Sequence, residues 1–326
     1  MYDLISIGDS ITDVLLEVDT TDTESMCRVD QEKCLICFEY GSKIPVSKMT
    51  RVLASGNAAN NAIGSARLGL KTAIYTVLGS DQDSQDTKKV FEDEDVSTEF
   101  VVMESGGRSN YSTIIDYGEE RTIFAYHEPR KYSFPPLPPV KWAYYTSVGK
   151  NHEIFHTQIP EYMKKYDISL AFSPGSFQIR EGLENLKPIL AAADLLILNK
   201  QEAMLLVGGE DLKESIVKLR ETGAKTIVIT DGAEGSVGSF DGKEFWRVGV
   251  PQNAPVVEST GAGDAYSTGF LAATIYGKPI AEAMVWGTLN ATSVIGQIGS
   301  RAGLLTKAGL EEFSRKYGIE LKPKLI

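Results

Sequence analysis

A short glycine-containing segment, STGAGDAYSTGF at residues 259–270, places one carboxylate at the start of an apolar helical pattern. Gly261, Ala262 and Gly263 precede Asp264, and their backbone N–H groups can form an anion-binding loop where the helix dipole also favours negative charge. Asp264 could serve only as the acidic cap of this helix. Beside a bound phosphoryl group, the same carboxylate could instead take a proton from a hydroxyl nucleophile.

A second pattern, HEIFH at residues 152–156, matches the helical zinc motif of many metallopeptidases. In that motif two histidines four residues apart bind the metal, and the glutamate acts as general base. The chain has three histidines, and the third, His127, lies in a separate predicted strand, so a third ligand would be an acidic residue without a recognisable motif. The segment therefore predicts a solvated helix and well under one zinc per chain. A zinc metallopeptidase is kept as a lesser alternative.

Six short apolar runs recur along the chain, and each ends in small or polar residues. Amphipathic patterns with helical spacing lie between most of them, at residues 57–69, 84–93, 153–165, 181–191 and 211–222. Apolar strands that alternate with helices are typical of a parallel sheet covered on both faces. The sequence therefore predicts a doubly wound α/β fold with a mostly parallel sheet, whose ligands bind beyond the carboxyl ends of the strands. The runs are LISIGD, AIYTVLG, WAYYTSVG, ISLAFSPG, DLLILN and TIVITDG.

Two regions break this alternation, at about residues 14–48 and 98–127. The first contains VLLEVD and CLICFEY, and the second contains TEFVVM, SNYSTIIDYG and ERTIFAYH, with Gly118 and Glu119 marking a hairpin turn. These strands predict a small β-sheet inserted into a single domain that spans residues 1–326. We expect the insertions to form a lid that closes over bound substrate. Because exposed strand edges are often covered by a second copy, we also expect a homodimer that pairs through the lid.

Composition and charge exclude several classes of protein. The chain has 326 residues, of which 42% are hydrophobic and 24% charged, as in a globular protein. Its net charge of −11 argues against a nucleic-acid partner, because phosphate binding needs clustered Lys and Arg. The sequence shows no signal-peptide layout and no apolar run near the ~20 residues that span a bilayer, so we expect no membrane partner. Three cysteines, at positions 27, 34 and 37, favour a reducing, cytoplasmic setting.

Several motifs follow one another in an order that resembles the ribokinase-like (PfkB) family of carbohydrate kinases. G-A-G-D at residues 261–264 resembles the end of the family's C-terminal signature, and SGNAANNAIGSARLG resembles its N-terminal signature. The family's first strand has its counterpart in GDSITD, and its N-x-x-E motif resembles LNKQEA. A nucleotide loop of the family resembles TDGAEG, and a late helix resembles NATSVIGQIG, which Asn290 begins. The resemblance implies these site residues: catalytic Asp264, Gly261, Ala262 and Gly263; substrate-binding Asp13, Gly56, Asn57 and Asn60; nucleotide-binding Asn199, Thr230, Gly232, Gly235 and Asn290; and Glu202 for magnesium through water.

The resemblance implies an ATP-dependent sugar kinase that uses magnesium. The γ-phosphoryl group would pass to a primary hydroxyl of a ketohexose such as fructose, or of a related sugar or sugar acid, with Asp264 as general base. A nucleoside kinase of the same family is the nearest alternative, and an inactive sugar-binding protein is the non-enzyme one. Ser55 replaces the first glycine of the N-terminal signature, and Glu258 replaces an aspartate that helps hold potassium in activated relatives. Activation by a monovalent cation is therefore left open.

Overall fold

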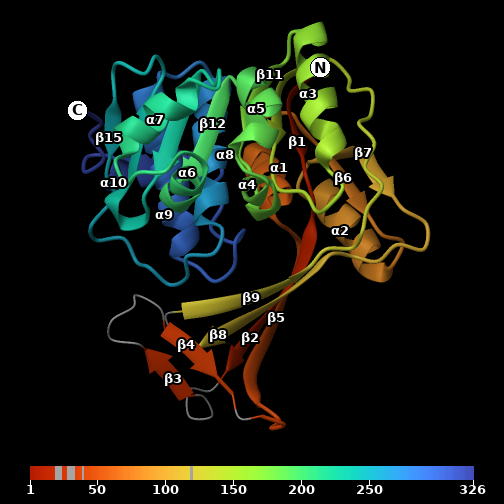
Figure 1. Cartoon of the computed structure of the whole chain (residues 1–326). Helices are drawn as coiled ribbons and strands as arrows, with labels where there is room; N and C mark the ends of the chain where they lie inside the picture. Colours follow the sequence, from red (N-terminus) through yellow and green to blue (C-terminus); the bar gives the residue numbers. More distant parts are fainter. Residues whose placement is uncertain (19–23, 28–33, 39, 118–119) are drawn as a thin grey trace.

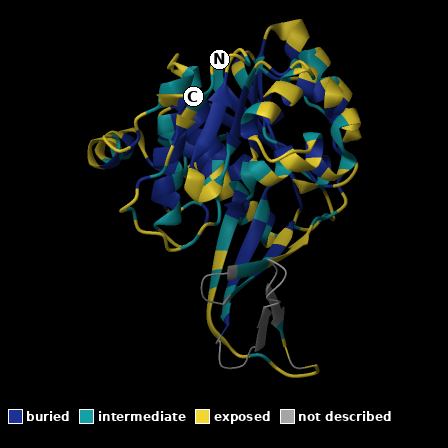
Figure 2. Ribbon diagram, turned by 60° about the vertical axis from the view of Figure 1, so that its left-hand side comes forward, coloured by how far each residue is buried: buried dark blue, intermediate teal, exposed yellow. Residues whose placement is uncertain are grey.

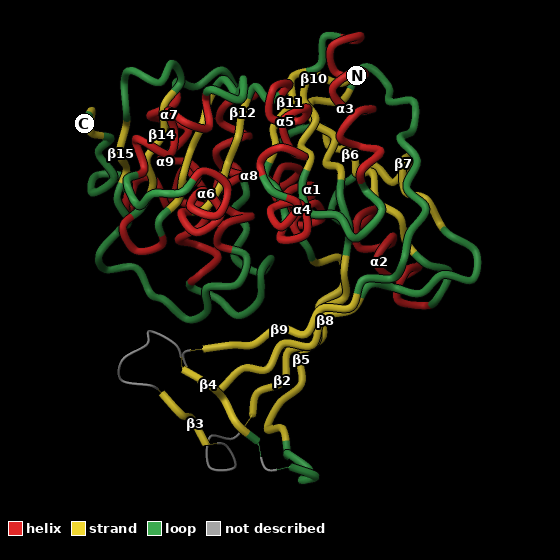
Figure 3. The backbone as a smooth tube through the Cα atoms, viewed as in Figure 1, coloured by secondary structure: helices red, strands yellow, loops and turns green. Residues whose placement is uncertain are grey.

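The first strand leads directly from the body of the protein into a small projecting sheet. The computed structural model describes residues 1–18, 24–27, 34–38, 40–117 and 120–326. Within these residues, ten strands form one large sheet, four form a smaller sheet, and two form a separate pair. Figure 1 shows the smaller sheet extending from one edge of the α/β body, and Figure 3 shows the same division by secondary structure.

The large sheet is parallel from β7 to β13 and antiparallel at its far end. β6 is buried at every position, as the apolar run AIYTVLG predicts for a strand covered on both faces. All six predicted apolar runs form strands of this sheet. In spatial order the strands are β7 (Ser97–Met103), β6 (Thr72–Leu78), β1 (Tyr2–Ile7), β10 (Val140–Tyr145), β11 (Ser169–Phe172), β12 (Leu195–Asn199), β13 (Thr226–Thr230), β14 (Ser236–Ser239), β15 (Trp246–Val248) and β16 (Lys324–Leu325).

Helices cover both faces of the large sheet, which confirms the doubly wound arrangement. On one face α3 to α7 contribute buried side chains such as Phe155, Leu186 and Ile216 to one core. On the other face α8 to α10 contribute Phe270 and Met284 to a second core, beside α1 and α2. Figure 2 shows the strands buried between these layers. The helices are α1 (Asn57–Arg67), α2 (Gln82–Asp93), α3 (Glu153–Tyr166), α4 (Ser176–Glu181), α5 (Leu183–Ala192), α6 (Lys200–Val207), α7 (Leu212–Arg220), η2 (Gly232–Glu234), α8 (Ala262–Ile275), α9 (Ile280–Ile295) and α10 (Lys307–Tyr317).

The small sheet has the strand order β5-β2-β8-β9. β2 pairs with β8 in parallel, and the other two pairs are antiparallel. The two-stranded sheet joins β3 to β4. The strands are β2 (Ile11–Val18), β5 (Val46–Ser55), β8 (Tyr111–Tyr117), β9 (Glu120–Tyr126), β3 (Glu24–Cys27) and β4 (Cys34–Cys37).

One strand assigned to the small sheet from the sequence belongs to the large one. Residues 98–103 lie in β7, which pairs in parallel with β6. The reason is that α2 connects these two strands, so β6, α2 and β7 form a β–α–β crossover of the main sheet. The first insertion also continues past its predicted end at residue 48, because β5 runs to Ser55. The hairpin turn predicted at 118–119 lies outside the described residues.

None of the helices in the described part of the chain is long and apolar enough to cross a membrane.

Candidate active site

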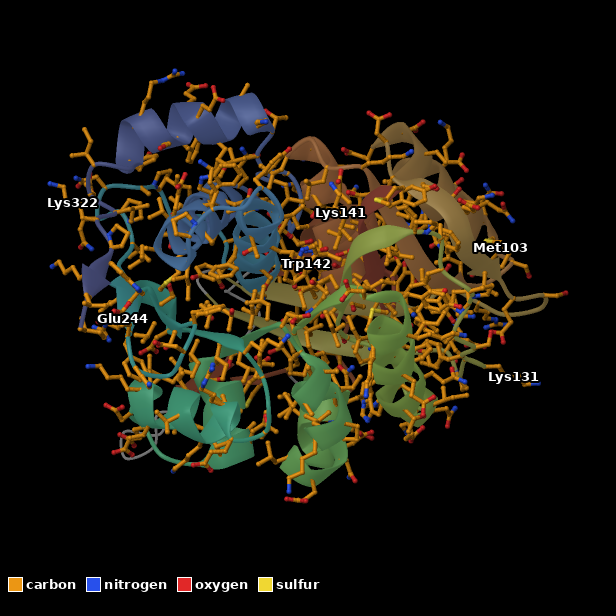
Figure 4. All side chains as sticks on the ribbon, turned by 90° about the horizontal axis from the view of Figure 1, so that it is seen from above. Met103, Lys131, Lys141, Trp142, Glu244 and Lys322 are labelled. Atoms are coloured by element: carbon orange, nitrogen blue, oxygen red, sulfur yellow. The ribbon has the colours of Figure 1, made fainter. Side chains whose placement is uncertain are left out.

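The predicted site residues gather at the carboxyl edge of the large sheet. α1 and α8 both begin at this edge, and the small sheet projects from it (Figure 1). Two surface hollows lie elsewhere, around residues such as Trp142 and Asp194 that stand where strands begin. Figure 4 looks onto that opposite edge, with Trp142 near its middle. The polar cluster described next, rather than either hollow, is therefore the candidate site.

Asp264 lies in the first turn of α8 and faces the start of α1. Asn60 Nδ2 donates a hydrogen bond of 2.8 Å to Asp264 Oδ2. Burial raises the pKa of Asp264 to about 6; the Asn60 hydrogen bond opposes this rise, and the nearby charge of Asp13 adds to it. A carboxyl with this pKa is largely ionised at pH 7 yet basic enough to accept a proton, which suits a general base.

A chain of polar contacts connects Asp264 to the small sheet. Ser300 Oγ donates to Asn60 Oδ1 at 3.4 Å and lies 3.2 Å from Ser55 Oγ. Ser55 Oγ in turn donates to Asp13 Oδ2. Burial raises the pKa of Asp13, although hydrogen bonds lower it in part. The structure therefore brings Asp13, Asn60 and Asp264 together, as predicted, from β2, α1 and α8.

Ser300 is a residue of this cluster that the sequence reasoning missed. Its backbone also explains one glycine of the GAGD loop, because a Cβ on Gly261 would lie 2.7 Å from Ser300 Cα. Gly261 has a φ of +79°, which other residues rarely adopt. No family motif marks residue 300, so the only signal is a polar residue after Gly299, itself in the left-handed region.

The loop before α8 supplies fewer free N–H groups than predicted. The Ala262 N–H donates to Ser259 O at 3.3 Å and so is engaged within the turn. A Cβ built on Gly263 would meet no atom within 4 Å, so the loop borders open space at that residue. Gly263 and the start of α8 therefore offer an exposed N-terminus to an anion.

Contacts from two other segments hold the loop in place. Glu258 Oε2 accepts the Gly299 N–H at 2.7 Å, and Thr260 Oγ1 donates to Glu258 Oε1. From β9, Arg121 Nη1 donates to Ser259 Oγ at 2.9 Å and lies 4.0 Å from Glu258 Oε1. The small sheet thus contacts the residues that immediately precede the GAGD segment.

Gly56 and Asn57 lie where β5 passes into α1. Gly56 is the N-cap residue with a φ of +96°, and a Cβ there would lie 3.1 Å from Asp9 O. Asn57 is the first residue of the helix and is partly exposed. Both therefore stand beside the Asp13 and Asn60 cluster, and the glycine is required by the turn itself.

Four predicted nucleotide residues lie at the ends of β12 and β13. Asn199 and Thr230 are direct partners in the parallel pairing of these strands. Gly232 and Gly235 bound the η2 turn that follows, and a Cβ on Gly235 would lie 2.0 Å from Val248 O. The turn therefore needs glycine at 235 to pass close to β15.

Asn199 and Glu202 form a reciprocal cap at the start of α6. The Glu202 N–H donates to Asn199 Oδ1, and the Asn199 N–H donates to Glu202 Oε2, each at 2.9 Å. Burial raises the pKa of Glu202 to about 7; backbone hydrogen bonding to Asn199 opposes this rise, and the charge of Asp264 adds to it. The charge of Asp264 thus acts on Glu202 across the carboxyl edge.

Asn290 does not have the position that the sequence predicted. It lies well inside α9 rather than at a helix start, and its side chain is 0% exposed. Its Nδ2 donates to Ala265 O at 2.7 Å, and its Oδ1 accepts the Leu305 N–H at 3.0 Å. Both ends of the amide are therefore used to connect α8, α9 and the segment before α10. Asn290 therefore packs inside the fold, with its amide engaged by these neighbouring segments.

The HEIFH segment also departs from its prediction. His152 is the N-cap residue of α3 and His156 lies in its first turn, but their exposed fractions are only 2% and 5%. The prediction of a solvated helix is therefore wrong for both histidines. Glu153, which would be the general base of a metallopeptidase, is exposed. The reason is that α3 packs Phe155 into the core and turns the adjacent His156 inward with it.

Known proteins resemble this chain over most of its length. The family model of the pfkB family carbohydrate kinases matches residues 27–307. A protein named an uncharacterized sugar kinase, from Archaeoglobus fulgidus, is 30% identical over 257 residues, which cover 74% of this chain and 98% of that protein.

Two solved structures share the fold. The nucleoside kinase of Methanocaldococcus jannaschii, described as an archaeal member of the ribokinase family, has a TM-score of 0.78 at 19% identity and covers 97% of this chain and 99% of its own. A ribokinase of Arabidopsis thaliana, in complex with ribose and ATP, has a TM-score of 0.79 at 18% identity. The match covers 96% of this chain and 98% of that one. The predicted fold, a doubly wound body with a small separate sheet, is thereby confirmed.

Proposed function

The chain belongs to the pfkB family of carbohydrate kinases, which are phosphotransferases, and from this premise we propose that it transfers the γ-phosphoryl group of ATP to a small sugar. The acceptor atom is a primary hydroxyl of a ketohexose such as fructose, or of a related sugar or sugar acid. The observation that carries the proposal is the contact chain from Asp13 through Ser55, Ser300 and Asn60 to Asp264.

Asp264 is the proposed general base. A sugar hydroxyl is a weak nucleophile, so a carboxylate must accept its proton as the oxygen attacks phosphorus. The raised pKa of Asp264 supports this role, and the Asn60 hydrogen bond orients the carboxylate. Asp13 and Asn60 are the proposed partners of the other sugar hydroxyls, which both donate and accept hydrogen bonds. Gly56 and Asn57 form the adjoining wall of the proposed sugar site.

The transferred phosphoryl group is proposed to lie at the N-terminus of α8. Gly261, Ala262 and Gly263 shape the loop, and the open space at Gly263 gives an anion room to approach. Backbone N–H groups and the helix dipole at that end favour the negative charge of the phosphoryl oxygens. No side-chain cation of the loop itself is needed for this contact.

The nucleotide is proposed to lie along Asn199, Thr230, Gly232 and Gly235. Glu202 would hold magnesium through water, and its carboxylate fits this ion, because magnesium prefers oxygen ligands and keeps several of its waters. When bound, magnesium neutralises charge on the ATP phosphates. Activation by a monovalent cation stays open, since Glu258 is already engaged by Gly299 and Thr260.

The small sheet is proposed to act as a lid within a single kinase domain. Asp13 on β2 belongs to the acceptor cluster, and Arg121 on β9 contacts Ser259 at the edge of the GAGD loop. Movement of the sheet would therefore change the acceptor and phosphoryl sites together. Closure over the sugar also excludes water, which protects ATP from hydrolysis.

A nucleoside kinase is the second candidate function, because a nucleoside kinase shares this fold over nearly the whole chain. The test measures kcat/KM for ketoses, aldoses, sugar acids and nucleosides at a fixed concentration of ATP and magnesium. We expect the highest value for a sugar. Preference for a nucleoside would select the alternative, and sugar binding without ATP turnover would indicate an inactive sugar-binding protein.

We predict that the protein is a homodimer that pairs through the lid. β9 is the edge strand of the small sheet, and it exposes Ile123, Phe124 and Tyr126, with Phe124 62% exposed. A second copy would remove this apolar edge from water. The Phe124→Asp variant should sediment as a monomer, whereas Leu205→Asp, on exposed α6, should leave the dimer intact. A parent protein that sediments as a monomer at micromolar concentration rejects the pairing.

A further inference from the structure

Two buried histidines and a carboxylate converge outside the site described above. The side chains are His152 and His156 from the start of α3 and Glu181 from the end of α4. One ligand atom from each lies within 4.8 Å of the other two. His152 Nε2 is 2.9 Å from Glu181 Oε1, and His156 Nδ1 is 3.8 Å from Glu181 Oε2. Metal–ligand bonds of 2.0–2.1 Å at a tetrahedral angle put ligand atoms roughly 3.3 Å apart, so these spacings suit one shared ion.

The hydrogen bonding of His152 fixes which ring nitrogen is free. His152 Nδ1 lies 2.6 Å from Gly149 O. A carbonyl oxygen only accepts, so Nδ1 carries the proton, and in the neutral ring Nε2 offers a lone pair toward Glu181. Metal-binding histidines commonly donate their other N–H to a backbone carbonyl in this way. The Nε2 atom is buried and makes no hydrogen bond of acceptable geometry, although the carboxylate is close.

His156 is also turned into the fold. Its side chain is 5% exposed, and its Nδ1 faces Glu181 Oε2. Its Nε2 is buried without a hydrogen-bond partner. Buried polar atoms without partners are costly. A cation bound among these groups would satisfy the imidazole nitrogens and the Glu181 carboxylate together.

We propose that His152, His156 and Glu181 bind one divalent transition-metal ion of the zinc class, which connects α3 to α4. Two imidazoles and one carboxylate are a common ligand set for zinc, whereas magnesium and calcium prefer oxygen ligands alone. Glu153 is exposed while the three ligands are turned inward, which does not suit the general base of a metallopeptidase. The proposal reverses the sequence-based expectation of well under one zinc per chain.

The proposed ion braces a loop beside the acceptor cluster. The Gly149 C=O accepts from His152, and the Gly149 N–H donates to Asp9 Oδ2 at 2.8 Å. Tyr132 Oη also donates to the Asp9 carboxylate. One residue, Gly149, thus connects the ion's ligand to Asp9, next to the end of β1. We infer a structural role for the ion, which acts on the kinase site only by holding this loop.

The test adds zinc chloride to full-length protein from which metal has been removed by a chelator. We expect one zinc per chain by elemental analysis and calorimetry, together with a higher melting temperature, because the ion binds the folded state. Cobalt substitution should give the visible absorption of a four-coordinate site. A parent protein that binds no stoichiometric zinc or cobalt overturns the proposal.

Variants locate the ion. His156→Gln and Glu181→Gln should weaken zinc binding at least 100-fold and abolish the melting shift, whereas Glu153→Gln should behave like the parent. Glu181→Gln is the decisive variant if His156→Gln folds poorly, because it keeps the size and shape of the side chain. Zinc retained at full affinity in both ligand variants, as expected if cysteines held it, would contradict the assignment. These measurements need no kinase assay and are independent of the proposed function.

Discussion

The Asp264→Asn variant is expected to lose about 10²–10⁴-fold or more in kcat while its fold is kept. The amide has the shape of the carboxylate, and its oxygen can still accept the hydrogen bond from Asn60 Nδ2. Asn also caps helices about as well as Asp, so α8 should begin at the same residue. What is lost is the proton acceptor, so the effect should fall on turnover.

Affinities for sugar and ATP should change little in this variant, because most proposed contacts lie elsewhere. The measurements are kcat, the two dissociation constants and the melting temperature of the same preparation. A folded variant with kcat within threefold of the parent would return Asp264 to a helix cap. A large loss of affinity with unchanged kcat would make it a binding residue instead.

The same variant should be more stable than the parent at pH 7. Burial raises the pKa of Asp264 to about 6 in the folded state, above its value of about 3.9 in an unfolded chain. The folded state therefore binds the proton more tightly, and stability is lost as pH rises from about 4 through 6. The amide of the variant carries no such charge, so the variant's melting temperature should exceed that of the parent at pH 7 and match it below pH 4.

The sequence predicted the main fold well because its signals are local and repeated. Each apolar run from LISIGD to TIVITDG forms a strand with a buried centre, as expected for a sheet covered on both faces. The prediction that β7 belongs to the small sheet failed because the signal for its sheet is not local. The residues of β7 are partly buried or exposed rather than fully buried, and only the connection through α2 shows which sheet it joins.

The site was predicted where motifs mark it and missed where tertiary contacts make it. Asp13, Asn60 and Asp264 come from separate motifs, and the structure brings them together. Ser300 has no motif and joins the cluster only because its loop packs against Gly261. Asn290 was misjudged because a polar residue in an apolar helix looks functional, although here it satisfies backbone groups of two neighbouring segments.

The pH dependence of kcat/KM is expected to have an acid limb near pH 6. Asp264 must be ionised to accept a proton, and burial raises its pKa to about 6. Below that pH, kcat/KM should fall about tenfold per unit, to roughly one hundredth of its plateau at pH 4. Two other groups titrate nearby: Glu202, with its pKa raised to about 7 by burial, and the terminal phosphate of ATP. The limb alone therefore does not identify Asp264.

The Asn60→Leu variant separates these contributions. Leucine has a similar shape but donates no hydrogen bond, so the ionised form of Asp264 loses the one contact that lowers its pKa. A hydrogen bond to a charged group contributes about 1.5–3 kcal/mol, so the acid limb should move up by roughly one pH unit or more. The pKa of ATP is the same in both assays, and Glu202→Gln should leave this movement intact.

Asn61→Leu is the matched control, because it makes the same change one residue along α1. Asn61 is buried, but it contacts Ser6 and Thr268 rather than Asp264. Its variant should lose stability like Asn60→Leu yet keep the acid limb of the parent. The position of the limb does not depend on the amount of active enzyme, so partial unfolding does not disturb the comparison. If the limb stays in place for Asn60→Leu, or moves equally for Asn61→Leu, the group that titrates near pH 6 is not Asp264, and the general base must be sought elsewhere.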